Sequence, residues 1–424
     1  MLKRKKHQSA FTRSLFDSEL PEDWRLVPVG DALRSTQYGL SEPGDSTGNT
    51  PIVGMRDLNN GSVNLLGLAT VDDGGADWTG MQLRRGDILL NRTNSAELVG
   101  KAGIVREDSE AVFASYLVRL DVDREKAEPE YVNYWLNTAI AQTALKRLST
   151  RGVSQANINP TEFRKHCPLP LPPLPEQRKI AEILRTWDEA IEKLEALRAA
   201  NLQRRIWMRT HLFTGRTRLP GYTGEWREVA LGEVLTEHGL QGTGAEEVFS
   251  VSVHKGLINQ IEHLGRSFAA ADTGHYNRVL PGDIVYTKSP TGDFPLGIIK
   301  QSKISQEVIV SPLYGVFTPA TRALGVILDA LFESPVAVRN YLHPLVQKGA
   351  KNTIAITNRR FLEGKLLLPK DPAEQSAIAE VVETSQAELT AIEAEIGLLT
   401  RQKRGLMQKL LTGEWRVKVE GSGA

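Results

Sequence analysis

The sequence predicts an α+β fold with two tandem α/β domains separated by two long helices, which form an antiparallel coiled coil with pseudo-two-fold symmetry. Three observations predict it. The chain is an internal duplication, each copy begins with short β-type segments, and each copy ends in a long helical pattern with apolar residues in steps of four and three. A length of 424 residues is enough for roughly three domain-sized units.

The duplication is visible at matched segments about 200 residues apart. WRLVPVGDALRST from Trp24 matches WREVALGEVLTEH from Trp226, and RRGDILLNRT matches LPGDIVYTKS. The order of residues in PPLPEQRKIAEIL returns in PKDPAEQSAIAEVV, so that Glu176 matches Glu374. Similarly, LFTG returns as LLTG. Solenoid repeats run roughly 20 to 50 residues, so this period indicates a duplicated domain plus a helix.

The first part of each copy is predicted to be β-rich and compact. DILLNRT, AGIV, DIVYTK and LGIIK are short apolar segments bounded by Gly-Asp and Asn-Gly turn signals. The predicted organisation is a basic N-terminal tail at 1–21, a first domain at 22–165, a central region with the first long helix at 166–220, a second domain at 221–366, and a C-terminal region with the second long helix at 367–424.

The two long helices are expected to start after prolines, at Pro175 and Pro372, and to end at about Phe213 and Leu411. The predicted seam, the row of residues facing the partner helix, contains Ile180, Leu184, Trp187, Ile191 and Leu194 in the first helix and Ile378, Val382, Leu389, Ile392, Ile396, Leu399 and Leu406 in the second. The first seam is polar at Arg198, Asn201 and Arg205. Acidic residues come early and basic residues late in each helix, which suits antiparallel pairing and also the helix dipole. The alternative is two core helices packed separately on their own domains.

Composition excludes several classes of protein. Lys plus Arg is 52 and Asp plus Glu is 51, so any contact with nucleic acid must rest on local basic faces, on partners, or on both. No apolar run approaches the ~18 residues of a membrane span, and the N-terminus lacks a signal-peptide core, so we expect a cytoplasmic protein. Cys167 is the only cysteine, which excludes an internal disulfide and a cysteine-based zinc site within one chain.

Motifs for catalysis are also missing, so we predict a non-catalytic chain with no cofactor and no metal. An amino-methyltransferase needs an Asn/Asp-Pro-Pro-aromatic loop, but NPTEF has Thr at the second proline. No Gly-x4-Gly-Lys-Ser/Thr string occurs. Asp283 and Lys288 in GDIVYTK faintly resemble a nuclease pair, but a turn Asp followed by an exposed cation is the favoured interpretation.

Two polar segments in each copy are candidates for contact with DNA. Arg and Lys suit phosphates and guanine, while Asn and Gln suit adenine. The candidates are Arg92, Thr93, Asn94, Ser95, Lys101, Arg151, Ser154, Gln155 and Asn157 in the first copy, and Lys288, Ser289, Thr291, Lys348, Lys351 and Asn352 in the second. The alternative is that these segments are solvated hairpin tips and ordinary loops.

Together these features resemble the DNA-specificity subunit of type I restriction-modification systems. The resemblance rests on PLPLPPLPEQRKIAEIL before a long helix and Thr-Gly, the openings at Trp24 and Trp226, GDIL and GDIV, and RGVSQANINPTEF. The second copy departs from it at PKDPAEQ and GAKNTIAITNRRF.

The resemblance implies two target-recognition domains that each read one half of a bipartite double-stranded DNA site, with the coiled coil setting the spacer. It also implies a non-catalytic subunit that recruits two methyltransferase subunits and two restriction subunits, which translocate and cleave DNA. A different class stays open at this point, namely a protein-binding scaffold with duplicated domains and a coiled-coil spacer.

Overall fold

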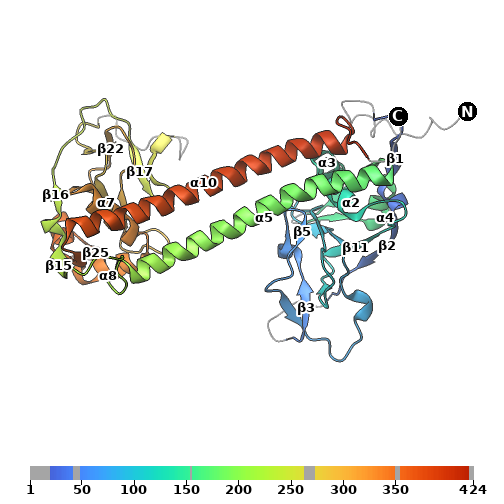
Figure 1. Cartoon of the computed structure of the whole chain (residues 1–424), viewed down its shortest axis with the longest axis horizontal. Helices are drawn as coiled ribbons and strands as arrows, with labels where there is room; N and C mark the ends of the chain where they lie inside the picture. The colour runs from blue at the N-terminus through green and yellow to red at the C-terminus, as the bar shows by residue number, and fades with distance from the viewer. Residues whose placement is uncertain (1–19, 42–47, 153–154, 262–272, 349–353, 420–424) are drawn as a thin grey trace, which may run out of the picture. The chain divides into compact units, whose positions relative to one another are not determined.

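The structure is a computed structural model that describes residues 20–41, 48–152, 155–261, 273–348 and 354–419. It divides into two compact units. Unit 1 comprises Met1–Lys193 and Ile396–Ala424, and unit 2 comprises Leu194–Glu395. Each unit therefore contains one mixed α/β domain and a part of each long helix (Figure 1).

A six-stranded sheet forms the centre of unit 1. Its order is β2 (Leu33–Tyr38), β11 (Leu117–Val122), β7 (Ile88–Asn91), β9 (Ala102–Ile104), β5 (Ser62–Val63) and β4 (Leu58–Asn59). All four residues of β7 are buried, and they alternate between two cores. Ile88 and Leu90 pack with α2 (Pro129–Leu136) and α3 (Ala139–Leu148), whereas Leu89 packs with Phe113 on the other face. This period-two alternation is what a central strand covered on both faces requires.

Smaller sheets complete unit 1. They are β10 (Val112–Phe113) with β3 (Thr50–Val53) and β6 (Ala69–Val71); β12 (Ser149–Arg151) with β13 (Ala156–Ile158) and β8 (Thr93–Asn94); and β1 (Arg25–Pro28) with β14 (Pro168–Leu171). Between β13 and β14 lies α4 (Pro160–His166), capped by the Asn159 side chain. The β1–β14 pair joins the opening of the domain to the proline run that leads into the first long helix.

Unit 2 repeats the same strand order. Its main sheet is β16 (Leu235–Glu237), β23 (Gly315–Pro319), β20 (Ile284–Thr287) and β21 (Ile298–Gln301), so β2–β11–β7–β9 returns as β16–β23–β20–β21. The β1–β14 pair returns as β15 (Trp226–Ala230) with β26 (Lys365–Pro369). The other elements are β17 (Phe249–Ser252), β18 (Gly256–Asn259), β19 (Asn277–Val279), β22 (Val308–Val310), β24 (Gln347–Lys348), β25 (Ile354–Ala355), α7 (Arg322–Phe332), α8 (Pro335–Leu342) and α9 (Asn358–Glu363).

The two long helices are α5 (Leu174–His211) and α10 (Pro372–Leu411). In unit 1, Ile180 and Leu184 of α5 share a core with Leu410 of α10. In unit 2, Met208 of α5 packs with Ile378 of α10. In unit 1, Asp188 of α5 pairs with Lys403 of α10, whereas the earlier residue Glu176 pairs with Arg416, beyond the end of α10. In unit 2, Arg198 pairs with Glu393 and the later Arg204 pairs with the earlier Glu388. The helices therefore run antiparallel in each unit. The predicted fold class, two α/β domains with two long paired helices, is confirmed.

Among the described residues, no helix is long and apolar enough to cross a membrane.

Candidate nucleic-acid interface

The structure brings the two predicted contact segments of unit 1 together in one small sheet. In β8, Thr93 pairs with Asn157 of β13, although the two residues are 64 positions apart in the sequence. Strand β13 in turn pairs with β12, which ends at Arg151. The polar residues after β7 and those before α4 therefore occupy one surface of unit 1.

Arg92 lies at the junction of these segments. Its Nη2 donates to Oδ1 of Asn157 at 3.3 Å, and its Nη1 donates to the backbone oxygen of Ser115 at 3.3 Å. The guanidinium carbon lies 4.9 Å from the ring centroid of Tyr38, a cation–π contact. Two hydrogen bonds and an aromatic face together fix the plane of the guanidinium group.

The amide of Asn157 is fully engaged inside this cluster. Its Oδ1 accepts from Arg92, and its Nδ2 donates to Oγ1 of Thr93 at 3.1 Å. Asn94 similarly donates to the Met55 sulfur at 3.4 Å. Asn157 and Asn94 thus hold neighbouring side chains in position, while the predicted residues Ser95, Lys101 and Gln155 are exposed. Ser154 lies outside the described residues.

Sequence reasoning did not include three residues of this surface. Tyr38, at the end of β2, is 52% exposed, and Tyr116, whose backbone oxygen accepts from the Arg92 amide, is 47% exposed. Asn91 is buried, and neither polar atom of its side chain has a hydrogen-bond partner among the described residues. Buried polar groups normally form hydrogen bonds, so the unpaired amide of Asn91 destabilises the folded state. Asn91 is the residue immediately before Arg92. A lone tyrosine at a strand end carries no pattern that would have indicated it.

In unit 2, the corresponding predicted segment follows β20. Lys288, Ser289 and Thr291 are exposed, and Thr291 forms a tight turn with Phe294 through backbone hydrogen bonds of 3.1 and 2.8 Å. Partial burial lowers the pKa of Lys288, an effect that the nearby Glu237 carboxylate opposes. Lys348, which is also predicted to contact DNA, lies at the end of β24. The predicted residues Lys351 and Asn352 lie outside the described residues.

The aspartates of the two Gly-Asp turns have structural partners. Asp283 is 1% exposed and accepts hydrogen bonds from Thr318 Oγ1 at 2.7 Å and the Leu280 amide at 2.8 Å, with His238 Nε2 at 2.9 Å. Asp87 pairs with Arg119 at 3.3 Å. Asp283 precedes β20 and Lys288 follows it, and the hydrogen bonds of Asp283 agree with the turn interpretation.

Each unit also contains a Trp–Glu–Arg clamp, a buried glutamate at the start of a long helix that is held by a tryptophan and an arginine. In unit 1, Trp24 Nε1 donates to Glu176 Oε2 at 3.1 Å, and Arg416 Nε donates to Glu176 Oε1 at 2.8 Å. Arg416 also bonds Asp23 at 2.7 Å. The clamp therefore ties the first strand of the domain, the start of α5 and the segment after α10 together.

The clamp of unit 2 has the same construction. Trp226 Nε1 donates to Glu374 Oε1 at 3.2 Å, and Arg218 donates to both carboxylate oxygens at 2.5 and 2.6 Å. Sequence reasoning matched the tryptophans and glutamates of the clamps but not their arginines. The signal existed, because Arg218 and Arg416 each follow the repeated Thr-Gly by the same spacing.

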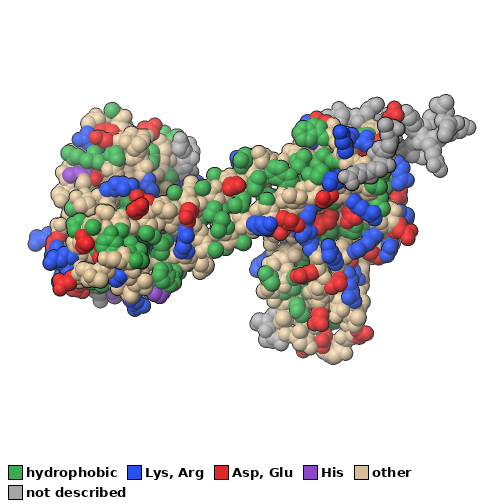
Figure 2. Space-filling model, viewed as in Figure 1, with side chains coloured by type: hydrophobic (Ala, Val, Ile, Leu, Met, Phe, Trp, Pro, Cys, Tyr) green, Lys and Arg blue, Asp and Glu red, His purple; other side chains and the backbone are tan. Residues whose placement is uncertain are grey.

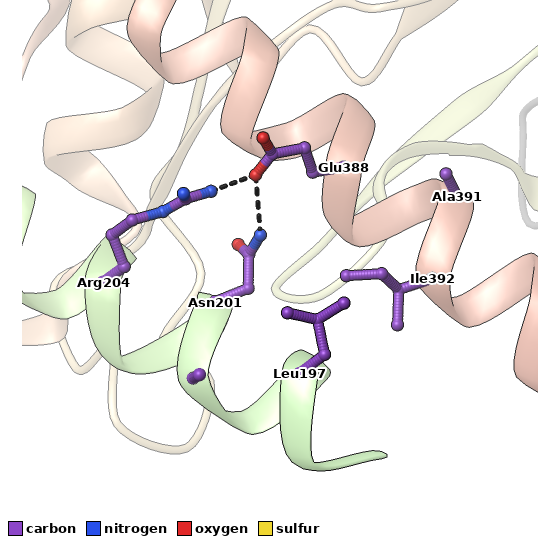
Figure 3. Close-up of a pocket in the computed structure, with 7 residues that line it drawn as sticks. Leu197, Asn201, Arg204, Glu388, Ala391 and Ile392 are labelled. Carbon is purple, nitrogen blue, oxygen red and sulfur yellow. Dashed lines mark hydrogen bonds and ion pairs between the residues drawn. The ribbon is translucent and has the colours of Figure 1, made fainter. Parts of the chain in front are cut away.

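The predicted seam residues all lie on α5 or α10 and are buried or partly buried. Ile180, Leu184, Ile378, Leu389 and Ile392 are buried, while Trp187, Ile191, Leu194, Val382, Ile396, Leu399 and Leu406 are partly buried. Asn201 is buried in the seam of unit 2, where its Nδ2 donates to Glu388 Oε2 at 3.1 Å (Figure 3). The Ser385 hydroxyl donates to Asn201 Oδ1 at 3.3 Å.

A hollow of about 500 Å³ opens beside this polar group in unit 2. It is lined by Leu197, Ala200, Asn201, Arg204, Glu388, Ala391 and Ile392, and most of its surface is apolar (Figure 3). Arg204 and Asn201 both donate to Glu388 at its edge.

Two copies of a domain, each with a cation directly after its buried central strand and each clamped to long paired helices, define a tandem recognition protein with a helical spacer. Residues 21–201 match the model of the type I restriction modification DNA specificity domain. Over these residues, the chain is similar to the type I restriction-modification specificity subunits.

Two relatives are similar to this chain in sequence, and one solved structure is similar to it in fold. The putative type I restriction enzyme MjaX specificity subunit of Methanocaldococcus jannaschii is 27% identical over 423 residues, covering 94% of this chain and 95% of the relative. The type I restriction enzyme EcoBI specificity subunit of Escherichia coli is 27% identical over 182 residues, covering 41% of this chain and 37% of the relative. The S subunit of a type I system from M. genitalium has a similar fold, with a TM-score of 0.60 and 15% identity over 93% of this chain and 97% of that chain.

Proposed function

We propose that this subunit reads a bipartite DNA site, with the domain of each unit contacting one half. The observation that carries the proposal is the repeated strand order β2–β11–β7–β9 and β16–β23–β20–β21, because a cation, Arg92 or Lys288, comes directly after the equivalent strand of each copy. Two similar frames with different side chains suit two different half-sites.

The side chains of unit 1 suit direct reading of a base edge. A guanidinium group offers only donors, and Arg to the O6 and N7 acceptors of guanine is the commonest specific contact in the major groove. Tyr38 and Asn157 restrict the side chain of Arg92, so it loses less conformational entropy on binding than a free arginine does. The exposed residues Ser95, Lys101 and Gln155 suit contacts with phosphates, which fix the register of the protein on the DNA.

The long helices would set the spacer between the half-sites. A helix of 38 residues such as α5 is about 57 Å long. Recognition domains at 22–165 and 221–366 would be held apart by α5 and α10, and the clamps would fix how each domain sits on the helix ends of its own unit.

The catalytic activities would come from partners, two methyltransferase subunits and two restriction subunits, which act on DNA in the cytoplasm. The helices offer a surface for such partners. In unit 2, Leu197, Leu202, Ile206 and Trp207 of α5 are exposed, and the apolar hollow lies beside Leu197. Figure 2 shows apolar side chains along the visible face of the helices. Contiguous apolar surface of this kind indicates protein contact.

Methylation sequencing of DNA from cells that carry this chain with its methyltransferase partner tests the proposal. The expected result is a two-part motif in which exchange of residues 22–165 for those of a relative changes only one half. The control exchanges 221–366 and should change only the other half. If no split motif appears in the wild type, the duplicated domains bind something other than DNA, and a protein-binding scaffold becomes the better description.

A further inference from the structure

In unit 2, a carboxylate acts on Lys288, one of the predicted DNA-contacting residues. Glu237 ends β16 and is exposed, and its backbone lies opposite Phe317 of β23. Asn358, the first residue of α9, donates from Nδ2 to Glu237 Oε1 at 2.6 Å. The charge of Glu237 also acts on Lys288, which follows β20. Three elements of unit 2 thus place one acid beside one predicted contact residue.

The direction of this carboxylate is fixed by its surroundings. Asn358 starts a helix that is capped by the Thr357 hydroxyl, which accepts from the Arg360 amide at 3.2 Å. The same helix is anchored by Phe361, which is fully buried and stacks on Tyr286 with ring centroids 4.8 Å apart. One oxygen of Glu237 accepts from Asn358, and the other, Oε2, has no hydrogen-bond partner among the described residues.

An acid in this position limits the DNA groups that it can contact. A carboxylate accepts hydrogen bonds and cannot donate them, so it repels phosphates and cannot bind the guanine or thymine acceptors. Cytosine and adenine both present an exocyclic amino group in the major groove, but the adenine amino group lies beside the N7 acceptor, which repels a carboxylate, so cytosine suits it better. In unit 1, by contrast, Arg92 pairs with the Asn157 amide, and no carboxylate of the described residues forms an ion pair with it.

We propose that Glu237 reads the N4 amino group of a cytosine in the half-site of unit 2, with Asn358 as the positioning residue that holds the carboxylate. This inference rests on the proposed function and makes it more specific. Lys288 then neutralises part of the repulsion between Glu237 and the phosphate backbone.

The test uses the full chain with its methyltransferase partner and the variants Glu237→Gln and Glu237→Asp. A carboxamide can still accept from Asn358, so Glu237→Gln keeps the fold, but it pairs with adenine N6 and N7. We expect one position of one half-site to move from cytosine toward adenine in methylation sequencing. Binding to duplexes that differ at this base should lose about tenfold of its discrimination. Glu237→Asp keeps the charge but not the reach, so it should lose discrimination without gaining affinity for unrelated DNA.

Glu228→Gln is the matched control, because Glu228 is an exposed glutamate on strand β15 of the same unit and its removal changes the net charge equally. It should leave the motif unchanged. The same motif and the same discrimination in Glu237→Gln as in the wild type, or a wild-type half-site without cytosine, would overturn the proposal. A wild type with no split motif at all would instead remove the proposed function itself.

Discussion

We call the contact between a domain and the long helices of its unit the joint. The joint of unit 1 has a charged acceptor, the carboxylate of Asp188, whereas the joint of unit 2 has an amide, Gln386, at the matching position. In unit 1, Asp188 of α5 accepts from Tyr134 at 2.6 Å and from Lys403 of α10. In unit 2, the matching positions hold Gln386 of α10 and Arg205 of α5, and Arg205 donates to Gln386 at 2.6 Å. These pairs are related by the same shift that relates Glu176 to Glu374.

The difference teaches which parts of a joint can change after duplication. The Trp–Glu–Arg clamps kept all three residue types, and the buried glutamate is the member that both donors need, because its loss leaves the tryptophan and the arginine without their acceptor. The pair in the seam has a cation in both units, Lys403 or Arg205, but its acceptor differs. Burial raises the pKa of Tyr134, so its hydroxyl remains a donor and requires an acceptor at Asp188, whereas unit 2 has Phe332 on the corresponding helix α7.

Removal of the clamp glutamate should have the largest effect. Glu374 is 1% exposed, and Glu374→Ala leaves the Arg218 guanidinium and the Trp226 indole N–H without their acceptor. We expect a loss of about 3–5 kcal/mol in the free energy of unfolding of unit 2. Hydrogen exchange of unit 2 peptides measures it. Glu383→Ala is the control on the same helix, since its ion pair with Arg322 is exposed and worth less than about 1 kcal/mol.

The asymmetric pair gives the next largest effect. Asp188→Asn keeps the size of the side chain but removes the charge that meets Lys403 and Arg106, so unit 1 should lose about 2 kcal/mol. Gln386→Ala removes a hydrogen bond from Arg205, which keeps its contact with Glu333, so unit 2 should lose about 1 kcal/mol. Chemical denaturation followed by hydrogen exchange separates the two units. Equal losses in the free energy of unfolding of the two units would show that the difference in charge between the joints does not affect stability.

Arg416→Ala should have a smaller effect than loss of a clamp glutamate. The Arg416 side chain is 44% exposed, so solvent screens its bonds to Glu176 and Asp23, and we expect a loss of about 1 kcal/mol in unit 1 only. Thermal unfolding is the measurement, with Lys418→Ala as the neighbouring control. A loss in unit 2 as well would contradict the assignment of this clamp to unit 1.

The smallest effect concerns pH and the Gly-Asp turn of unit 1. Burial raises the pKa of Asp87 above 3.8, although the Arg84 amide and Arg119 oppose the shift. The native state therefore holds this proton to higher pH than the unfolded chain, and the contribution to stability is full below 3.8 and is lost as pH rises through the folded pKa. Asp87→Asn should remove this loss, so the wild type declines relative to the variant across that window in denaturant titrations. Parallel curves would show that Asp87 does not titrate differently on folding.

The long helices could be predicted from the sequence more completely than the contact surface. The second helix was expected from Pro372 to about residue 411, and α10 has these bounds, because a periodic seam is a local signal. The first was expected to reach Phe213, but α5 ends at His211 before Gly215, whose φ of 67° no helix can contain. The cluster around Arg92 depends on the pairing of β8 with β13, a long-range contact that neither period nor spacing encodes.

The clamp and core of unit 1 have a consequence for synthesis on the ribosome. Leu410 and Leu411 complete the core of the first domain, and Arg416 completes its clamp, so this domain lacks part of its interior until residues 410–416 have been synthesised. Unit 2 is one continuous segment, Leu194–Glu395. Domains usually fold in the order of their emergence. Here the second domain can fold first, while the nascent first domain exposes apolar surface until residues 410–416 emerge.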